Sequence, residues 1–174
     1  MTCIILAAGY ATRLLPITHS FPKPLLPVRG RTVLDLLVDN IGLSERIDRF
    51  VVVTNHRNIE YFNIWNRKRK EIISVIDDMT ETNNTRLGFV GDLDLAISTL
   101  PNEEDLLVVS GSVLFDLNLG EFIEMALKKM QHAFFAVWKI QLNHRLIAGS
   151  GKYVQTSLRT LHSLQINPIV RAKQ

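Results

Sequence analysis

The segment 6–28 holds the residue types best suited to chemistry in this sequence. Its small residues at positions 7–9, Ala-Ala-Gly, let backbone N–H groups approach an anion closely. Thr12 adds a hydroxyl, and the planar guanidinium of Arg13 matches the geometry of phosphate oxygens. Lys23 lies between two prolines, which stiffen the backbone and aim its ammonium group. These residues predict a site for an oligophosphate, such as a nucleoside triphosphate.

The same segment has a simpler interpretation as a surface loop with incidental charges. It contains neither the G-x-G-x-x-G pattern of dinucleotide-binding folds nor the G-x-x-x-x-G-K-[ST] pattern of P-loops. Residues 7–30 are rich in Gly and Pro and show no sustained apolar period, which predicts a long loop. Long loops in compact domains usually carry function, and this favours the oligophosphate interpretation.

Short apolar runs with β-branched residues predict buried strands, and they cover 2–6, 50–54, 72–76, 106–109 and 133–138. Amphipathic helices are predicted between them, over 33–42, 57–70, 88–100 and 119–130. This alternation is typical of a parallel sheet with helices on both faces. The predicted fold class is therefore α/β, a Rossmann-like three-layer α/β/α sandwich with a mainly parallel sheet. Ligands of such sheets bind beyond the carboxyl ends of the strands, where the 6–28 loop begins.

Two helix ends carry local signals. Thr32 followed by Asp35 matches a capping box at the start of the helix 33–42. The helix over 57–70 is expected to close with the basic run Arg67–Lys70, which suits the negative end of a helix dipole.

Four aspartates occur in two close pairs that resemble metal ligands or an acid–base pair. Asp77 and Asp78 are adjacent at a predicted strand end, so their side chains point apart and a strand-terminus role is expected. Asp92 and Asp94 are two positions apart on a predicted helix and do not share a face. The single Cys3 and the five scattered histidines show no ligand spacing, so they predict no metal site.

The chain has 174 residues, which corresponds to about one domain at the usual ~150 residues. Hydrophobic residues make up 47% and charged residues 21%, as in a globular protein. No apolar run reaches the ~18 residues of a membrane span, and the apolar start lacks the basic region of a secretory signal. A cytoplasmic location is therefore expected.

The net charge of +3 is unevenly distributed: residues 1–124 sum to −5, and residues 125–174 sum to +8 without a single acid. The basic end has three interpretations: a nucleic-acid or membrane-surface patch, an ordinary solvated face, or a tail that did not evolve with the rest, as after a frameshift or by decay. Its charges are spread out and not interleaved with aromatic residues, so neither nucleic acid nor membrane is expected as a partner.

Two motifs of the first loop, L-A-A-G-x-x-T-R-L over 6–14 and P-K-P-L-L-P-V over 22–28, resemble the signature of nucleotidyltransferases of the sugar-phosphate pyrophosphorylase family. Glucose-1-phosphate thymidylyltransferases are members of that family. The resemblance extends through 51–55, 77–93 and 105–117. It implies the nucleotide-diphospho-sugar transferase type of fold, with a nucleotide-binding domain over 1–138 and an atypical basic tail over 139–174.

The resemblance also implies a reaction, in which a nucleoside triphosphate and a sugar 1-phosphate give a nucleoside diphosphate sugar and pyrophosphate. Arg13 and Lys23 would be catalytic: Arg13 stabilises the pyrophosphate leaving group, and Lys23 neutralises charge that develops at the α-phosphate. The attacking phosphate oxygen is already anionic at neutral pH, so no general base is required. The implied nucleotide-binding residues are Leu6, Ala7, Ala8, Gly9, Thr12, Arg13, Lys23, Gly88 and Gly111.

Two departures from the family pattern predict that catalysis is weak or absent. Ser112 stands where the family has an aspartate that binds the catalytic Mg²⁺, so Mg²⁺ is expected by family but its site is incomplete and no metal ligand is assigned. Asp116 belongs to the usual pattern and does not replace that aspartate. No acid occurs after Glu124, so the tail supplies no second metal carboxylate, and the family's sugar-binding half is missing or unrecognisable.

Three functions therefore stay open: nucleotidyl transfer, nucleotide binding without catalysis, and a vestigial scaffold. Cytidylyl transfer to phosphocholine is the alternative substrate class. The expected partners are a nucleoside triphosphate and a sugar 1-phosphate. Apolar surface left exposed by an incomplete sheet would favour a homo-oligomer.

Overall fold

The computed structural model describes residues 1–19, 21–101, 105–115 and 120–124, together with three short strands at 134–136, 153–155 and 167–171. Its seven-stranded sheet has the order β5-β4-β1-β6-β9-β7-β8. The parallel strands are β1 (Thr2–Leu6), β4 (Arg49–Thr54), β5 (Ile73–Asp77) and β6 (Asp105–Ser110). The antiparallel strands are β7 (Phe134–Ala136), β8 (Tyr153–Gln155) and β9 (Asn167–Arg171).

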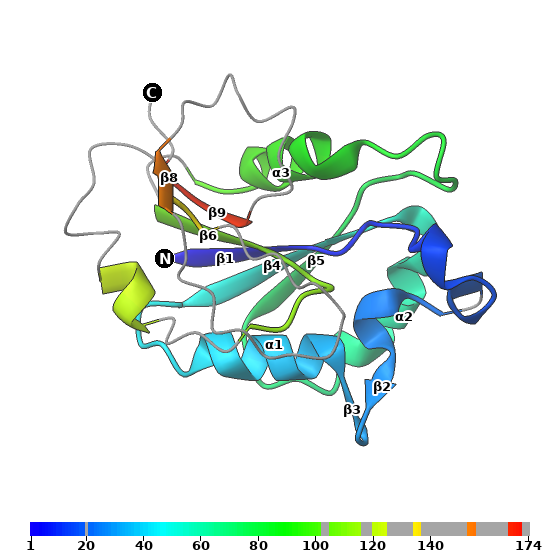
Figure 1. Ribbon diagram of the computed structural model, residues 1–174, viewed down its shortest axis with the longest axis horizontal. Coiled ribbons are helices and arrows are strands. Elements are labelled where there is room, and N and C mark those ends of the chain that lie inside the picture. Colours follow the sequence, from blue (N-terminus) through cyan, green and yellow to red (C-terminus); the bar gives the residue numbers. More distant parts are fainter. Residues whose placement is uncertain are drawn as a thin grey trace.

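Helices cover both faces of this sheet (Figure 1). On one face lie α1 (Val33–Gly42) and α2 (Ile59–Asn66), and on the other lies α3 (Gly88–Ser98). Successive residues of β1 alternate between two apolar cores: Cys3 and Ile5 belong to the core under α1 and α2, and Ile4 belongs to the core under α3. The predicted three-layer α/β/α sandwich is confirmed.

The four parallel strands end together at one edge of the sheet. Leu6, the last residue of β1, pairs with Val53 on one side and with Ser110 on the other. Thr54 at the end of β4 pairs with Asp77 at the end of β5. The loops that follow these strands are therefore neighbours, and the first loop emerges in the middle of that edge.

The start of α1 forms as its local sequence predicts. A two-stranded ribbon, β2 (Pro27–Val28) and β3 (Arg31–Thr32), leads into the helix. The Thr32 hydroxyl accepts from the Asp35 N–H (2.9 Å), and the Asp35 carboxylate accepts from the Thr32 N–H (2.9 Å). The capping box is therefore confirmed, and it satisfies two backbone donors that the first turn would leave unpaired.

The predicted helix over 57–70 is shorter at both ends than its sequence pattern indicates. A single 3-10 turn, His56–Asn58, precedes α2, and the helix ends at Asn66. The basic run Arg67–Lys70 therefore follows the helix, with Arg67 as the C-cap residue, and lies at its negative end as expected. Within this run, Arg69 pairs with Asp35 and Asp39 of α1 and with Glu71, which precedes β5.

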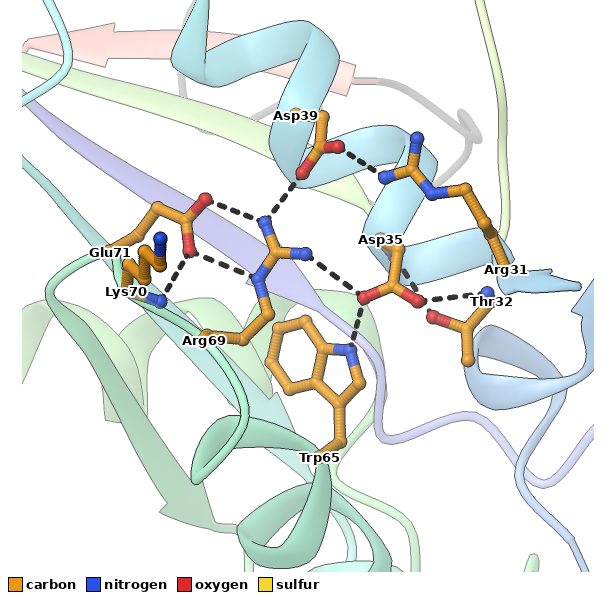
Figure 2. Close-up of polar contacts among 8 residues, drawn as sticks. All are labelled: Arg31, Thr32, Asp35, Asp39, Trp65, Arg69, Lys70 and Glu71. Carbon is orange, nitrogen blue, oxygen red and sulfur yellow. Dashed lines mark hydrogen bonds and ion pairs between the residues drawn. The ribbon is translucent and has the colours of Figure 1, made fainter.

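Arg69 is the centre of the polar network shown in Figure 2. Its Nη1 donates to Asp35 Oδ1 (3.1 Å) and its Nη2 to Asp39 Oδ1 (2.5 Å). Its Nε and Nη2 also hold both carboxylate oxygens of Glu71, at 3.0 and 2.6 Å. The guanidinium lies 5.8 Å from the Trp65 ring centroid, and the Trp65 indole N–H donates to Asp35 (2.8 Å). The network joins α1, the end of α2 and the connection that leads to β5.

Within the predicted helix 119–130 the structure describes residues 120–124, which are helical and bury Phe122 and Ile123. The predicted strand 133–138 contains β7. The remainder of that helix, Asp116 and most of the basic tail lie outside the described residues. The boundary between residues 138 and 139 stays a prediction.

Candidate functional site

The first loop leaves the sheet between β4 and β6. The N–H of Ala7 continues the pairing by donating to the Val53 carbonyl (2.8 Å). Residues 6–8 are buried, and Gly9 is the first exposed residue of the loop. Among the predicted nucleotide-binding residues 6–9, Gly9 therefore presents its backbone to solvent, whereas the other three form the wall behind it.

Gly111 lies directly against this wall. Its N–H donates to the Leu6 carbonyl (2.8 Å). A Cβ at this position would lie 3.0 Å from the Cβ of Ala7 and 3.2 Å from Cγ2 of Ile5, closer than ordinary van der Waals contact. The close approach of the two strand ends therefore favours a glycine here. Its role in nucleotide binding stays a prediction.

A cleft opens beyond Gly9, between the first loop and the turn that follows β4. It is open to solvent and is lined by Gly9, Tyr10, Ala11, Thr18, Pro22, Lys23, Arg57 and Asn58. Lys23 and Arg57 thus bring two cationic side chains to one cleft beside exposed loop backbone. This combination suits an anionic ligand with several oxygens, such as a phosphate group.

Arg57 is the cationic residue of this cleft that the sequence analysis missed. Asn55, which is fully buried, accepts from the Asn58 N–H (3.1 Å) and so forms the turn that carries Arg57. The same side chain donates to the Ala8 carbonyl (2.8 Å) and docks the turn on the first loop. The available signal was positional: Arg57 follows the carboxyl end of a predicted strand, where ligands of parallel sheets bind.

Thr12 and Arg13 lie on an exposed 3-10 turn, Thr12–Leu14, next to the cleft but not among its lining residues. The turn is preceded by Ala11, which has a left-handed backbone (φ 46°) and whose carbonyl accepts from the Thr18 hydroxyl (2.9 Å). The structure thus brings Gly9 and Lys23 together and leaves Arg13 outside the lining. The catalytic roles of Arg13 and Lys23 stay predictions.

Gly88 is the first residue of α3, and it has a left-handed backbone with φ 76°. This conformation favours glycine for a purely local reason, because a Cβ would clash with the adjacent carbonyl. The predicted contact of Gly88 with the nucleotide is neither required nor opposed by this geometry.

Hydrogen bonds tie the first loop to the segment after β5. The Tyr10 hydroxyl lies 2.9 Å from Thr80 Oγ1, and the Thr80 carbonyl accepts from the His56 N–H (2.9 Å). His56 Nδ1 lies 2.6 Å from the Asp77 carboxylate, whose hydrogen bond and charge raise the pKa of the exposed imidazole. Three loops that are distant in the sequence are thereby joined around the cleft.

The two hydroxyls that the structure places at the end of β6 are poor ligands for Mg²⁺. They belong to Ser110 and Ser112, whose Oγ atoms lie 3.2 Å apart. Mg²⁺ is bound in proteins through carboxylates, phosphates and water. Among the described residues there is also no group of three or more His, Cys, Asp and Glu side chains that could hold a metal.

No described helix has the length and apolar character that crossing a membrane requires. The expected cytoplasmic location stays a prediction.

Comparison with known proteins assigns the chain to a family. The family model described as nucleotidyl transferase matches residues 2–145. The bifunctional protein GlmU of Methanococcus maripaludis is 30% identical over 155 residues, which cover 84% of this chain and 34% of the relative. The UTP–glucose-1-phosphate uridylyltransferase of Synechocystis is 30% identical over 138 residues, covering 74% of this chain and 35% of the relative.

The chain therefore spans about a third of the length of these curated relatives. Among solved structures, a UDP-glucose pyrophosphorylase complexed with UDP-glucose superposes with a TM-score of 0.60 at 18% identity, covering 98% of this chain and 74% of that chain. At that identity the likeness shows the fold. The family match and the fold agree with the loop motifs, and the chain belongs to the nucleotidyl transferase family.

Proposed function

We propose that this chain binds a nucleoside triphosphate in the cleft between the first loop and the turn after β4. The observation that carries the proposal is the convergence of Lys23 and Arg57 on one cleft with the loop backbone from Gly9 to Ala11. The phosphate chain carries several negative charges, which two cations and backbone N–H groups can neutralise together. Membership of the nucleotidyl transferase family supports a nucleotide over other anions.

The reaction proposed for the family site is nucleotidyl transfer to a sugar 1-phosphate. A phosphate oxygen of the acceptor would form a bond to the α-phosphorus while the bond to pyrophosphate breaks. Lys23 would neutralise the charge that develops at the α-phosphate, and Arg13 would stabilise the departing pyrophosphate. The name of the Synechocystis relative, a UTP–glucose-1-phosphate uridylyltransferase, supports this substrate class.

We further propose that turnover by this chain is weak, because Ser112 supplies a hydroxyl where the family pattern has a carboxylate for Mg²⁺. A neutral oxygen binds a hard dication poorly. Nucleotide binding that relies on Lys23, Arg57 and the loop backbone would survive this loss, whereas the chemical step would not.

Calorimetric titration of the chain with each common nucleoside triphosphate, with Mg²⁺ and with EDTA, tests the binding. We expect one nucleotide to bind in both conditions. Lys23→Ala and Arg57→Ala should each weaken binding roughly 10- to 100-fold, the usual size of a lost charged hydrogen bond. Lys68→Ala removes an exposed cation outside the cleft lining and should leave the affinity unchanged. Absence of binding to every nucleotide would overturn the proposal in favour of a vestigial scaffold.

Pyrophosphate release tests the catalytic part. Pairs of nucleoside triphosphates with sugar 1-phosphates, and CTP with phosphocholine, are supplied to the wild-type chain and to Ser112→Asp. We expect wild-type turnover well below the usual ~1–10³ s⁻¹ of enzymes. Turnover within that range would refute the proposed impairment, and release with CTP and phosphocholine alone would select the alternative substrate class.

A further inference from the structure

Two buried carboxyl groups meet beside the candidate site, on elements that are not adjacent in the sequence. Asp78 directly follows β5, and Asp92 lies on the second turn of α3. Their exposed fractions are 5% and 7%. The carboxyl of Asp92 is within hydrogen-bonding reach of that of Asp78. Asp78 lies at the strand end as expected, and Asp92 and Asp94 differ in burial as expected for residues on different faces. The meeting of Asp78 with Asp92 was not predicted, because it arises from tertiary packing.

The contacts of this pair require a proton. Ionised carboxylates accept hydrogen bonds but cannot donate them. With both side chains ionised, Asp78 Oδ2 and Asp92 Oδ1 would be buried with no donor among the described residues. Two adjacent buried negative charges would also repel each other in a poorly polarisable environment. A single proton between the two groups removes both penalties.

The surroundings place that proton on Asp92. Asp78 Oδ1 accepts from both the N–H and the hydroxyl of Thr80, each at 2.7 Å, so this oxygen already has two donors. Burial, and then the charge of Asp78, raise the pKa of Asp92 to about 7. The strand residues under α3 are apolar, and among the described residues the charged group acting on Asp92 is Asp78.

Other titratable groups face Asp78 rather than Asp92. They are Tyr10 on the first loop and His56 on the turn after β4, and the charges of Arg57 and Glu81 act in turn on Tyr10. Of these, His56 is already paired with Asp77. None of them replaces the proton as a donor to the two unpaired oxygens.

The pair is linked to the cleft through Thr80. Because the Thr80 hydroxyl gives its one hydrogen to Asp78, the hydrogen in its contact with Tyr10 (2.9 Å) must come from the Tyr10 hydroxyl. The order of donation is therefore Tyr10 to Thr80 to Asp78, and the proton on Asp92 would be donated to the same carboxylate. Tyr10 lines the candidate cleft.

We propose that Asp78 and Asp92 share one proton near neutral pH, and that this shared proton positions the segment after β5 and Tyr10 at the cleft. Asp78 and Asp92 are positioning residues in this scheme, since neither lines the cleft. Loss of the proton places two charges between α3 and the segment after β5, which pushes the two apart. The consequence for nucleotide affinity rests on the proposed function, whereas the consequence for stability does not.

The stability test compares Asp92→Asn with the wild type by urea unfolding between about pH 4.5 and pH 8.5, in EDTA. An amide has nearly the shape of a carboxylic acid and donates to Asp78 at every pH. Because the wild-type folded state holds a proton that the unfolded state has released, its folded-to-unfolded ratio should fall by up to about tenfold per pH unit relative to Asp92→Asn, levelling off above about pH 7. Asp94→Asn, on the exposed face of the same helix, should track the wild type.

Parallel curves for the wild type and Asp92→Asn would overturn the proposal, as would the same divergence in Asp94→Asn. The unfolding measurement is also repeated with Mg²⁺ in place of EDTA. If Mg²⁺ stabilises the wild type but not Asp92→Asn at high pH, the proposal is overturned, because the pair of carboxylates would then hold a cation. In the second arm, wild-type nucleotide affinity should fall above about pH 7 relative to Asp92→Asn. If neither protein binds a nucleotide, the proposed function is refuted. The stability measurement still shows whether Asp78 and Asp92 share a proton.

Discussion

Replacing Arg69 with methionine removes the guanidinium of the network in Figure 2 while keeping an unbranched apolar stem over Trp65. The change deletes the contacts to Asp35, Asp39 and Glu71. It also leaves three carboxylates close together without their shared cation. Since these carboxylates come from α1 and from the connection between α2 and β5, the loss should weaken the packing of α1 against the α2–β5 unit.

The expected loss of stability follows from how exposed the paired side chains are. The side chains of Arg69 and Asp35 are 13% and 20% exposed, so this contact counts as a partly buried charged hydrogen bond of about 1.5 kcal/mol. Asp39 and Glu71 are 42% and 34% exposed, and solvent screening reduces each to about 0.5 kcal/mol. The total is about 2.5 kcal/mol, equivalent to a fall in Tm of roughly 5–10 °C for a chain of this size.

Urea unfolding at neutral pH measures this loss, with Arg67→Met as the matched control. Arg67 is exposed and makes no ion pair with any described residue, so its replacement should change stability by less than about 0.5 kcal/mol. A loss for Arg69→Met no larger than that of the control would refute the argument that Arg69 holds the two elements together.

The dependence of stability on pH below neutrality tests the same network a second time. Partial burial opposes ionisation, but hydrogen bonds from Thr32 and Trp65 and the charge of Arg69 outweigh it and lower the pKa of Asp35. Hydrogen bonds from Arg69 likewise lower the pKa of Asp39 and of Glu71 against partial burial. Carboxyls with lowered folded-state pKa values stabilise the fold above their unfolded pKa of about 4 and lose that contribution as pH falls further. The difference in unfolding free energy between the wild type and Arg69→Met should therefore shrink below about pH 4. A difference that stays constant with pH would contradict this account of the network.

Two further substitutions and one labelling experiment have defined outcomes. Gly111→Ala places a Cβ 3.0 Å from the Cβ of Ala7, which should lower stability by about 1–3 kcal/mol in urea unfolding; a neutral result would mean that the strand ends separate easily. Thr32→Ala removes the hydroxyl that accepts from Asp35 and should lower stability by about 1 kcal/mol, whereas Thr32→Ser should retain most of it. Cys3 is fully buried, and burial raises the pKa of its thiol, so the folded chain should react with a thiol reagent only as fast as it unfolds.

Local patterns in the sequence determined the elements of the fold. Apolar β-branched runs form β1 and β4, because such side chains fit a sheet that is covered on both faces. The Thr32–Asp35 capping box starts α1 where it was expected, because its bonds join residues three apart. The loop motifs likewise identified the family and placed Lys23 near exposed backbone, since strand order puts that loop at the carboxyl edge.

Tertiary structure decided which distant side chains meet. Arg57 joined Lys23 because Asn55 docks the turn after β4 on the first loop, and no local pattern reports that contact. Arg69, just beyond the end of α2, meets Asp35 of α1, a contact that the pattern of neither helix indicates. Pairwise contacts of this kind depend on the packing of α1 and α3 against the sheet. Propensity and periodicity describe one element at a time, so the partners on a neighbouring element become visible only once the chain has folded.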